Sequence, residues 1–442
     1  MKKDIIFIAD FFESHLIGGA ELNDSVLISS LIEKNYRVQK IRSTAVTLKF
    51  LKNNKDKFFI ISNFVGTDAR CLKFIASHLE YIVYEHDHKY LNTRDPSEFL
   101  EHNSLGVNSI NPNDIVNSRL YTRAKAVVCL SNICKQIIQE ILGCENVINI
   151  GTSLWSEEYL DKMEKISKVK SKKAMVLKST HPTKNMSAAI RYCHENKIKY
   201  DLVGDLDPQD FIERMAEYET LVYIPKVLET FCRLVVEAKM LNCKVRTIKH
   251  LIGASSESHI SLYGDELIEE TRKRVKKAID TFCQIIDSPQ SKRKKRISFI
   301  GKFRKLHDEE GKAKALEKCN YAVRRFDENS FDVNSETINN PLTLIQSNPD
   351  YVFYTKLRVP NASQVMSLAE KNLFDTVCWM PDLYWGLERE KEILDRKPMF
   401  RGSYVFSPDG GNQHRFHENN INHFPIKQAI SEDNCVKEEI QN

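Results

Sequence analysis

Short apolar runs and amphipathic stretches alternate along the first 150 residues of the chain. The runs have the length of buried β-strands, and helical periodicity fills several intervals between them, as at 68–79 and 132–142. This alternation is typical of a parallel sheet with helices on both faces. The expected strands are 5–9, 37–41, 58–62, 81–84, 126–130 and 147–150.

The alternation restarts after a lysine-rich stretch at 162–173, which we expect to be an exposed linker. Two successive α/β halves predict two domains separated by a cleft. We place the first domain at 1–155 and the second at 156–310, with a hinge at 149–152. The expected strands of the second half are 174–177, 200–203, 221–224 and 245–248.

Beyond about residue 318 the pattern becomes mixed. Strand signals at 351–359 are followed by a helical stretch at 364–371 and an aromatic cluster around Trp379, Tyr384 and Trp385. We expect an accessory domain of α+β type at 318–442, with a frayed end after about residue 430. No motif in it indicates a role.

The most informative local pattern lies between residues 221 and 248. The strand at 221–224 ends before Pro225, which cannot donate to a sheet ladder. Thr230 is a suitable N-cap, and the apolar spacing from Phe231 onward predicts a helix at 231–241. Glu229 therefore lies just before a helix N-terminus, and Glu237 lies two turns inside the helix.

A helix N-terminus offers unpaired N–H groups and the positive end of a dipole, which suits a diphosphate. An ionised glutamate only accepts hydrogen bonds, which suits a sugar diol. The spacing alone indicates little, because two glutamates eight positions apart also occur on an ordinary solvated helix face.

The strand at 5–9 feeds a loop that contains Gly18, Gly19, Ala20 and Glu21, and a helix follows. A strand, a glycine pair and a helix form a βα unit with room for a ligand at the turn, although a simple tight turn has the same residues. The chain contains no Gly-x-Gly-x-x-Gly and no Walker lysine, so dinucleotide and ATP fingerprints are absent.

The loop after the fourth strand carries His86 and His88 among acidic residues. The carboxyl end of a parallel strand is where an open α/β sheet binds its ligand. The two histidines could instead bind a metal, but the sequence shows no third cluster of ligands. Each histidine could also be a satisfied polar residue of the loop, and we prefer that interpretation for His88.

Two groups of basic residues are further candidates. Lys178 and Lys184 lie at the first turn of the second half, where two ammonium groups could neutralise an anion, although surface lysines are the alternative. The segment 291–305 holds eight Lys or Arg residues. It is either a solvated surface or a patch for nucleic acid or anionic lipid head groups. Its core is Lys292, Arg293, Lys294 and Lys295.

The composition limits the number of domains, the class of protein and the cellular compartment. The 442 residues allow two or three domains, and 42% hydrophobic with 28% charged residues is typical of a soluble globular protein. The net charge of +5 does not by itself indicate nucleic acid. The 11 scattered cysteines predict free thiols in a reducing cytosol, and no apolar run is long enough to span a membrane. We expect a cytoplasmic protein.

The segment from Glu229 to Ala238 resembles the E-x7-E motif of retaining GT-B glycosyltransferases, especially those of family 4. Glu229 and Glu237 match the motif glutamates, Phe231 is kept, and Cys232 stands where the family usually has glycine. Gly18-Gly19-Ala20-Glu21 resembles the turn that these enzymes carry near the donor phosphates. The loop at 84–96 also looks like stretches of phage-encoded glycosyltransferases.

The resemblance implies an α/β protein of GT-B fold, with two Rossmann-like domains facing across a cleft. It implies a nucleotide-sugar donor, no metal or other cofactor, and transfer with retention at the anomeric carbon. The residues implied at the reacting centre are Glu229, His86 and Lys184. Those implied at the donor are Gly18, Gly19, Lys178, Lys184, Thr230, Phe231, Cys232 and Glu237.

Three functions remain open from the sequence. The first is a glycosyltransferase whose acceptor is a glycan or a lipid-linked sugar. The second is a DNA glycosyltransferase that modifies a hydroxymethylated base in duplex phage DNA, with Lys292, Arg293, Lys294 and Lys295 as phosphate contacts. The third is a non-catalytic protein of GT-B type that binds sugar or nucleic acid.

Overall fold

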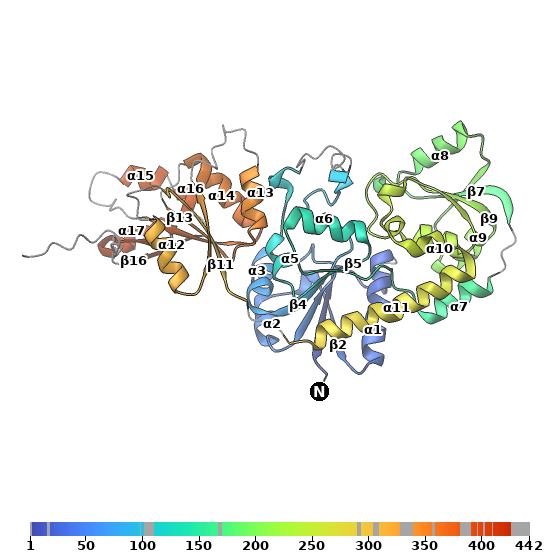
Figure 1. Ribbon diagram of the computed structural model, residues 1–442, viewed down its shortest axis with the longest axis horizontal. Helices are drawn as coiled ribbons and strands as arrows, with labels where there is room; N and C mark the ends of the chain where they lie inside the picture. The colour runs from blue at the N-terminus through green and yellow to red at the C-terminus, as the bar shows by residue number, and fades with distance from the viewer. Residues whose placement is uncertain are drawn as a thin grey trace, which may run out of the picture. The chain divides into compact units, whose positions relative to one another are not determined.

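The computed structural model describes residues 2–15, 18–97, 99–100, 110–166, 170–289, 293–303, 309–327, 339–355, 359–380, 390–395, 397–400, 403–408 and 410–425. These residues form three parallel β-sheets flanked by helices (Figure 1). The contacts divide the chain into two compact units, 1–110 with 123–290 and 111–122 with 291–442. The first unit holds the first two sheets, and the second unit holds the third.

The first sheet has the order β2-β1-β3-β4-β5-β6, and all of its strand pairs are parallel. Strands β1, β3, β4 and β5 are almost wholly buried, which explains their continuous apolar sequences. All six expected strands are confirmed within one or two residues. They are β1 (Asp4–Ala9), β2 (Arg37–Arg42), β3 (Phe58–Ile61), β4 (Glu80–Tyr84), β5 (Val127–Cys129) and β6 (Val147–Asn149).

Helices follow most of these strands, and both helices expected at 68–79 and 132–142 are present. The helices of this part of the chain are α1 (Gly19–Glu33), α2 (Leu48–Asn53), α3 (Ala69–His78), α5 (Ser118–Arg123) and α6 (Asn132–Leu142).

The second sheet has four parallel strands in the order β10-β9-β7-β8. The stretch 162–173, expected as a linker, contains the end of α7 and the start of β7. The strands are β7 (Ser171–Leu177), β8 (Tyr200–Val203), β9 (Tyr218–Val222) and β10 (Lys244–Arg246). The helices are α7 (Glu157–Lys165), α8 (Met186–Glu195), α9 (Pro208–Ala216), α10 (Arg233–Met240) and α11 (Gly264–Asp287).

Helix α11 joins the two halves of the first unit. It begins after the second sheet, and its 24 residues, about 36 Å of helix, reach the first sheet. There Phe282 packs edge-on against Tyr84 at 5.1 Å, and Asp280 pairs with Lys34 at 2.9 Å. One hydrophobic core runs from the first sheet through α1, α10 and α11 to the second sheet. Two Rossmann-like domains are thus held around a shared core, which confirms the predicted GT-B class.

The third sheet has the order β12-β11-β13-β14-β15-β16, again entirely parallel. The expectation of an α+β domain is therefore wrong, because this region is a third α/β sheet. It also begins earlier than residue 318, since β11 belongs to it and not to the predicted second domain at 156–310. The strands are β11 (Arg296–Gly301), β12 (Ala322–Asp327), β13 (Tyr351–Thr355), β14 (Asp375–Trp379), β15 (Ser403–Ser407) and β16 (His423–Pro425).

Helices cover the two faces of the third sheet unequally. One face packs against α13, α14, α16 and α17, and Figure 1 shows the first three of these along one side of the sheet. The other face packs against α12 over β11 and β13. The helices are α12 (Glu309–Lys318), α13 (Asn339–Gln346), α14 (Val359–Lys371), α15 (Glu390–Asp395), α16 (Lys397–Phe400) and α17 (Gln413–Glu418).

The second unit also contains an early segment of the chain, residues 111–122. Arg119 is buried, and its guanidinium pairs with Asp375 at 2.9 Å and donates to the carbonyl of Leu373. The fully buried Asn372 donates to the carbonyl of Ile115 and accepts from the backbone N–H of Ser118. This segment is an integral part of the second unit. None of the helices in the described residues is long and apolar enough to cross a membrane.

Candidate functional site

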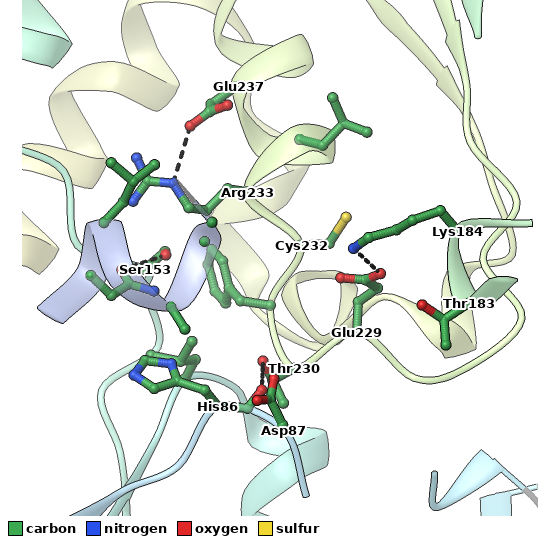
Figure 2. Close-up of a pocket in the computed structure, with 18 of the residues that line it drawn as sticks. His86, Asp87, Ser153, Thr183, Lys184, Glu229, Thr230, Cys232, Arg233 and Glu237 are labelled. Atoms are coloured by element: carbon green, nitrogen blue, oxygen red, sulfur yellow. Dashed lines mark hydrogen bonds and ion pairs between the residues drawn. The ribbon is translucent and has the colours of Figure 1, made fainter. Parts of the chain in front are cut away.

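A cavity of about 680 Å³ lies between the first and second sheets of the first unit. Its walls come from the N-terminus of α1, the loop after β4, the loop after β7 and the segment from β9 into α10. Figure 2 shows the polar side chains that point toward it. The predicted residues that line it are Gly18, Gly19, His86, Lys184, Glu229, Thr230, Phe231, Cys232 and Glu237.

Helix α10 begins two residues later than predicted. Its N-cap is Cys232, with φ +72°, and its first residue is Arg233. Cys232 thus adopts the left-handed conformation that glycine favours, at the position where the resembling family has glycine. Thr230 does not cap the helix, because its hydroxyl donates to the carbonyl of His86 at 2.9 Å. No side chain caps the N-terminus of α10, which faces the cavity.

The loop before α10 is fixed by the backbone of residues 251–253. Glu229 donates its N–H to the carbonyl of Leu251 and accepts from the N–H of Gly253, at 2.9 and 2.8 Å. A Cβ at Gly253 would collide with the carbonyl oxygen of Thr230. Only glycine permits this close approach, so Gly253 holds Glu229 at the edge of the cavity.

The carboxylate of Glu229 is held by two donors. Lys184 and the hydroxyl of Tyr223 both reach its Oε1, at 2.8 and 2.6 Å. Burial lowers the pKa of Lys184, but the attraction of Glu229 outweighs it and holds that pKa above its usual value. The ammonium is therefore charged at neutral pH. Lys184 is about one-third exposed and borders the cavity, where it can also reach an anion.

Glu237 is more deeply engaged than its sequence position suggests. Its Oε1 accepts from the indole Nε1 of Trp155 at 2.8 Å and lies 3.3 Å from Nε of Arg233. The Arg233 guanidinium also lies 4.6 Å from the ring centroid of Trp155 and donates to the carbonyl of Leu154. These contacts fix Glu237 with one oxygen satisfied inside the protein.

His86 sits over a buried carboxylate. Its Nε2 lies 3.3 Å from Oδ1 of Asp24, and Asp24 also accepts from the hydroxyl of Ser62. Its ring packs edge-on against Tyr84 at 4.2 Å. Both imidazole and carboxylate are almost fully buried, so the pair is shielded from solvent.

His88, interpreted from the sequence as structural, also lines the cavity. It has a left-handed backbone, with φ +55°, and its Nδ1 is 2.9 Å from the hydroxyl of Tyr90. Burial lowers the pKa of His88 to about 4, so the ring is neutral at physiological pH.

The glycine pair opens α1 directly at the cavity. Gly18 is the N-cap in an extended conformation, without a side-chain cap. A Cβ at Gly19 would come within 3.7 Å of the Arg233 side chain, which shows how closely the starts of α1 and α10 approach each other. Asn23 of α1 accepts from the Ser153 hydroxyl and the Leu154 N–H, and it ties α1 to the segment after β6.

Some predicted residues lie elsewhere. Lys178 does not line the cavity, and its exposed ammonium pairs with Asp205 at 2.6 Å. Arg293, Lys294 and Lys295 lie in the second unit just before β11, and Lys292 falls outside the described residues.

The sequence analysis missed several polar residues of the cavity, above all Arg94, His181, Thr183 and Arg233. Arg233 could have been found, because it is the first basic residue after the glutamate that precedes α10. The His181 imidazole and the Thr183 hydroxyl are 2.7 Å apart on the loop that carries Lys184. Across the described ranges, no group of three His, Cys, Asp or Glu side chains is placed to hold a metal ion.

The arrangement combines two chemistries in one cavity. Two helix N-termini and Lys184 provide N–H donors and positive charge for an anion. Glu229 and Glu237 provide rigid acceptors for hydroxyl groups. The cavity can therefore hold a ligand with a charged part beside a polyhydroxylated part.

No protein-family model matches the sequence, and no curated protein matches it. Two crystal structures of HepE from Anabaena are similar, one in complex with UDP and one with UDP and glucose. Their identities are 16% and 14%, and each match has a TM-score of 0.36 and covers 64% of this chain and 92% of HepE. This similarity is too low to support an argument about function.

Proposed function

We propose that the protein is a nucleotide-sugar-dependent glycosyltransferase. The observation that carries this proposal is the meeting of the α1 and α10 N-termini with Lys184, Glu229 and Glu237 in one cavity. A nucleoside diphosphate sugar has matching parts, because its diphosphate needs N–H donors and cations, and its sugars present hydroxyl groups.

Each group has a distinct task in this proposal. Lys184 and the first amides of α10 stabilise the diphosphate as negative charge develops on it. Glu229, fixed by Lys184 and Tyr223, orients the transferred sugar from one side of the cavity. Glu237 is fixed by Trp155 and Arg233, and its other oxygen accepts from the ribose. His86 contributes to the wall of the sugar site.

The finer assignments are also proposals. Retention at the anomeric carbon and the absence of a metal requirement rest on the resemblance carried by Glu229, Glu237 and the glycine pair. A glycan or lipid-linked sugar is the proposed acceptor. Cys232, which stands where the resembling family has glycine, keeps the left-handed backbone that glycine would supply.

A second acceptor remains a candidate, namely a hydroxymethylated base in duplex DNA. Arg293, Lys294 and Lys295 favour it, because they form an exposed basic run before β11. Transfer of radiolabelled sugar onto such a duplex, compared with transfer onto a glycan mixture, separates the two acceptors.

The activity is tested by incubating the protein with UDP-, GDP- and ADP-sugars and measuring free nucleoside diphosphate. We expect release with one of these donors, because water can take the place of the acceptor hydroxyl. If no donor is turned over, either alone or with acceptor mixtures, the protein is a binding protein and not a glycosyltransferase.

The glutamates sharpen the test. Glu237→Gln should weaken donor binding by about 1–3 kcal/mol, because the ribose hydroxyls lose a charged acceptor. Calorimetry with the donor measures this loss, and Glu195→Gln on the exposed side of α8 is the matched control. Unchanged affinity would refute the ribose assignment.

Glu229→Ala should lower kcat more than it raises the donor KM, since its proposed role is to position the sugar at the reacting carbon. Steady-state kinetics separates the two parameters. A change in KM alone would assign Glu229 to ground-state binding.

A further inference from the structure

Strands β14, β15 and β16 turn a set of large apolar side chains to one face of the third sheet. Their register places Val377 beside Tyr404 and aligns Trp379, Phe406 and Phe424 across three neighbouring strands. The alternating residues, such as Cys378 and Val405, point the other way into the core under α14, α16 and α17. We call the set Val377, Trp379, Tyr404, Phe406 and Phe424 the aromatic face.

The aromatic face is open to solvent. Tyr404 is 44% exposed and Phe424 is 40% exposed, and Trp379 and Phe406 are only partly buried. Helix α12 covers the same side of the sheet over β11 and β13, where its residues pack against Phe299 and Phe353. Single exposed aromatics are ordinary, but a contiguous set across three strands marks an interaction surface.

The rings contact one another across the strands. Phe406 and Phe424 are stacked, with centroids 5.4 Å apart and an interplanar angle of 27°. Tyr404 lies 6.2 Å from Phe424 and is tilted by 41° to it. The three rings therefore form one contiguous cluster on this face.

Cations border the aromatic face. The ammonium of Lys312 lies 5.3 Å from the ring centroid of Trp379. Lys295 donates to the hydroxyl of Tyr351 on the same side of β13, and it belongs to the exposed basic run 293–296. The carboxylate on that side of β14, Asp375, is paired with Arg119. The border thus favours a partner with negative charge.

We propose that the aromatic face binds single-stranded nucleic acid. Unpaired bases stack on aromatic side chains, and their phosphates are attracted by neighbouring cations, so both properties of the surface are used by one ligand. A neutral glycan would use the rings and leave the cations without a role. This surface lies in the second unit, and the proposal is independent of the proposed sugar transfer.

The test measures binding of a fluorescein-labelled oligo-deoxythymidine of about 16 nucleotides to the full chain by anisotropy at low salt. We expect binding that weakens with salt and is reduced at least about tenfold in the Tyr404→Ala/Phe424→Ala double variant, because each lost ring removes a stacking contact. Phe11→Ala removes a ring of similar exposure (41%) from the first unit, and it should leave binding unchanged.

Several results would overturn the proposal. One is a wild type that does not bind the oligonucleotide at low salt. Another is equal binding by the double variant, which would leave only the basic run as the contact. Equal competition by blunt duplex DNA would exclude base stacking. A polysaccharide that binds in place of the oligonucleotide, or a dimer that the double variant abolishes, would assign the aromatic face to a glycan or to a second copy of the chain.

Discussion

The first and third sheets arrange their strands in the same order, but helices cover them differently. In both, the second strand in sequence lies at one edge beside the first, and the later four follow on the other side. On the first sheet, the face that carries Phe7 and Tyr84 is closed by α1 and also by α11. On the third sheet, the corresponding face has α12, and the described residues include no counterpart of α11.

The difference shows that strand order alone does not decide which apolar side chains become core. Phe58 and Tyr84 of the first sheet are fully buried, whereas Tyr404 of the third sheet is 44% exposed. On the first sheet, α11 comes from a distant part of the sequence and buries side chains that would otherwise be exposed. Where no such helix arrives, the same architecture presents a surface.

The comparison is tested most directly by removing one ring that packs on the first sheet and one ring that belongs to the third sheet. Phe282→Ala should cost about 3–5 kcal/mol of stability, because it opens a cavity under α11 in the shared core. Tyr404→Ala should change stability by only about 0.5 kcal/mol or less, because the ring is exposed. Urea denaturation followed by far-ultraviolet circular dichroism measures both. Equal costs would mean that α11 does not distinguish the two sheets.

A smaller effect concerns the buried histidine beside the first sheet. The pKa of His88 is about 4 in the folded protein and about 6.5 in an unfolded chain, so the unfolded state binds more protons between these values. The free energy of unfolding is therefore unaffected by this group above about pH 6.5. It decreases as the pH drops toward 4, by up to about 3 kcal/mol.

His88→Asn should flatten this acid limb of the stability profile, and asparagine tolerates the left-handed backbone. Thermal unfolding measured between pH 7 and pH 4 checks it, with the exposed His250→Asn as control. His259, whose pKa is also lowered to about 4 by burial, leaves a residual slope of the same sign. If the variant loses stability between pH 7 and pH 4 as steeply as the wild type, protonation of His88 does not cause the loss.

The smallest expected effect lies at the start of α10. Cys232→Gly should change stability by only about 1 kcal/mol or less, because relief of the left-handed conformation offsets the loss of a buried thiol. Cys232→Val should be more destabilising, by about 2 kcal/mol, since a β-branched residue is strained at φ +72°. Differential scanning calorimetry distinguishes them, and similar melting temperatures would show that the backbone there relaxes.

Much of the first unit could be predicted because its strands are buried on both faces. Continuous apolar runs such as those of β3 and β4 carry that signal within four or five residues. The segment from Pro225 to Glu237 was also readable, since proline, apolar spacing and two acids are local features. These local patterns indicated two successive α/β halves, the glycine pair of the cavity, and the glutamates and lysine that line it.

The remaining features depend on distant contacts. The start of α10 is displaced to Arg233 because Leu251 and Gly253 fix the loop before it. Trp155, which donates a hydrogen bond to Glu237, is 82 positions away in the sequence. The third sheet was wrongly predicted as α+β because exposed positions interrupt its apolar patterns, as in β12, where only Phe326 is buried. Lys178 was assigned from its resemblance to a basic position of the family, and its ion pair with Asp205 could not be predicted from the sequence.

The segment at 111–122 can reach its native contacts only late in the synthesis of the chain. Ser118 and Arg119 are made early, but the residues that bury them, Asn372 and Leu373, follow 254 positions later. At a synthesis rate of roughly 5–20 residues per second, Ser118 and Arg119 lack these partners for about 10–50 s. During that interval the nascent chain carries Arg119 without its carboxylate partner, Asp375. A ribosome-bound chain that stops before residue 371 should therefore be a substrate for chaperones, and the completed chain should not.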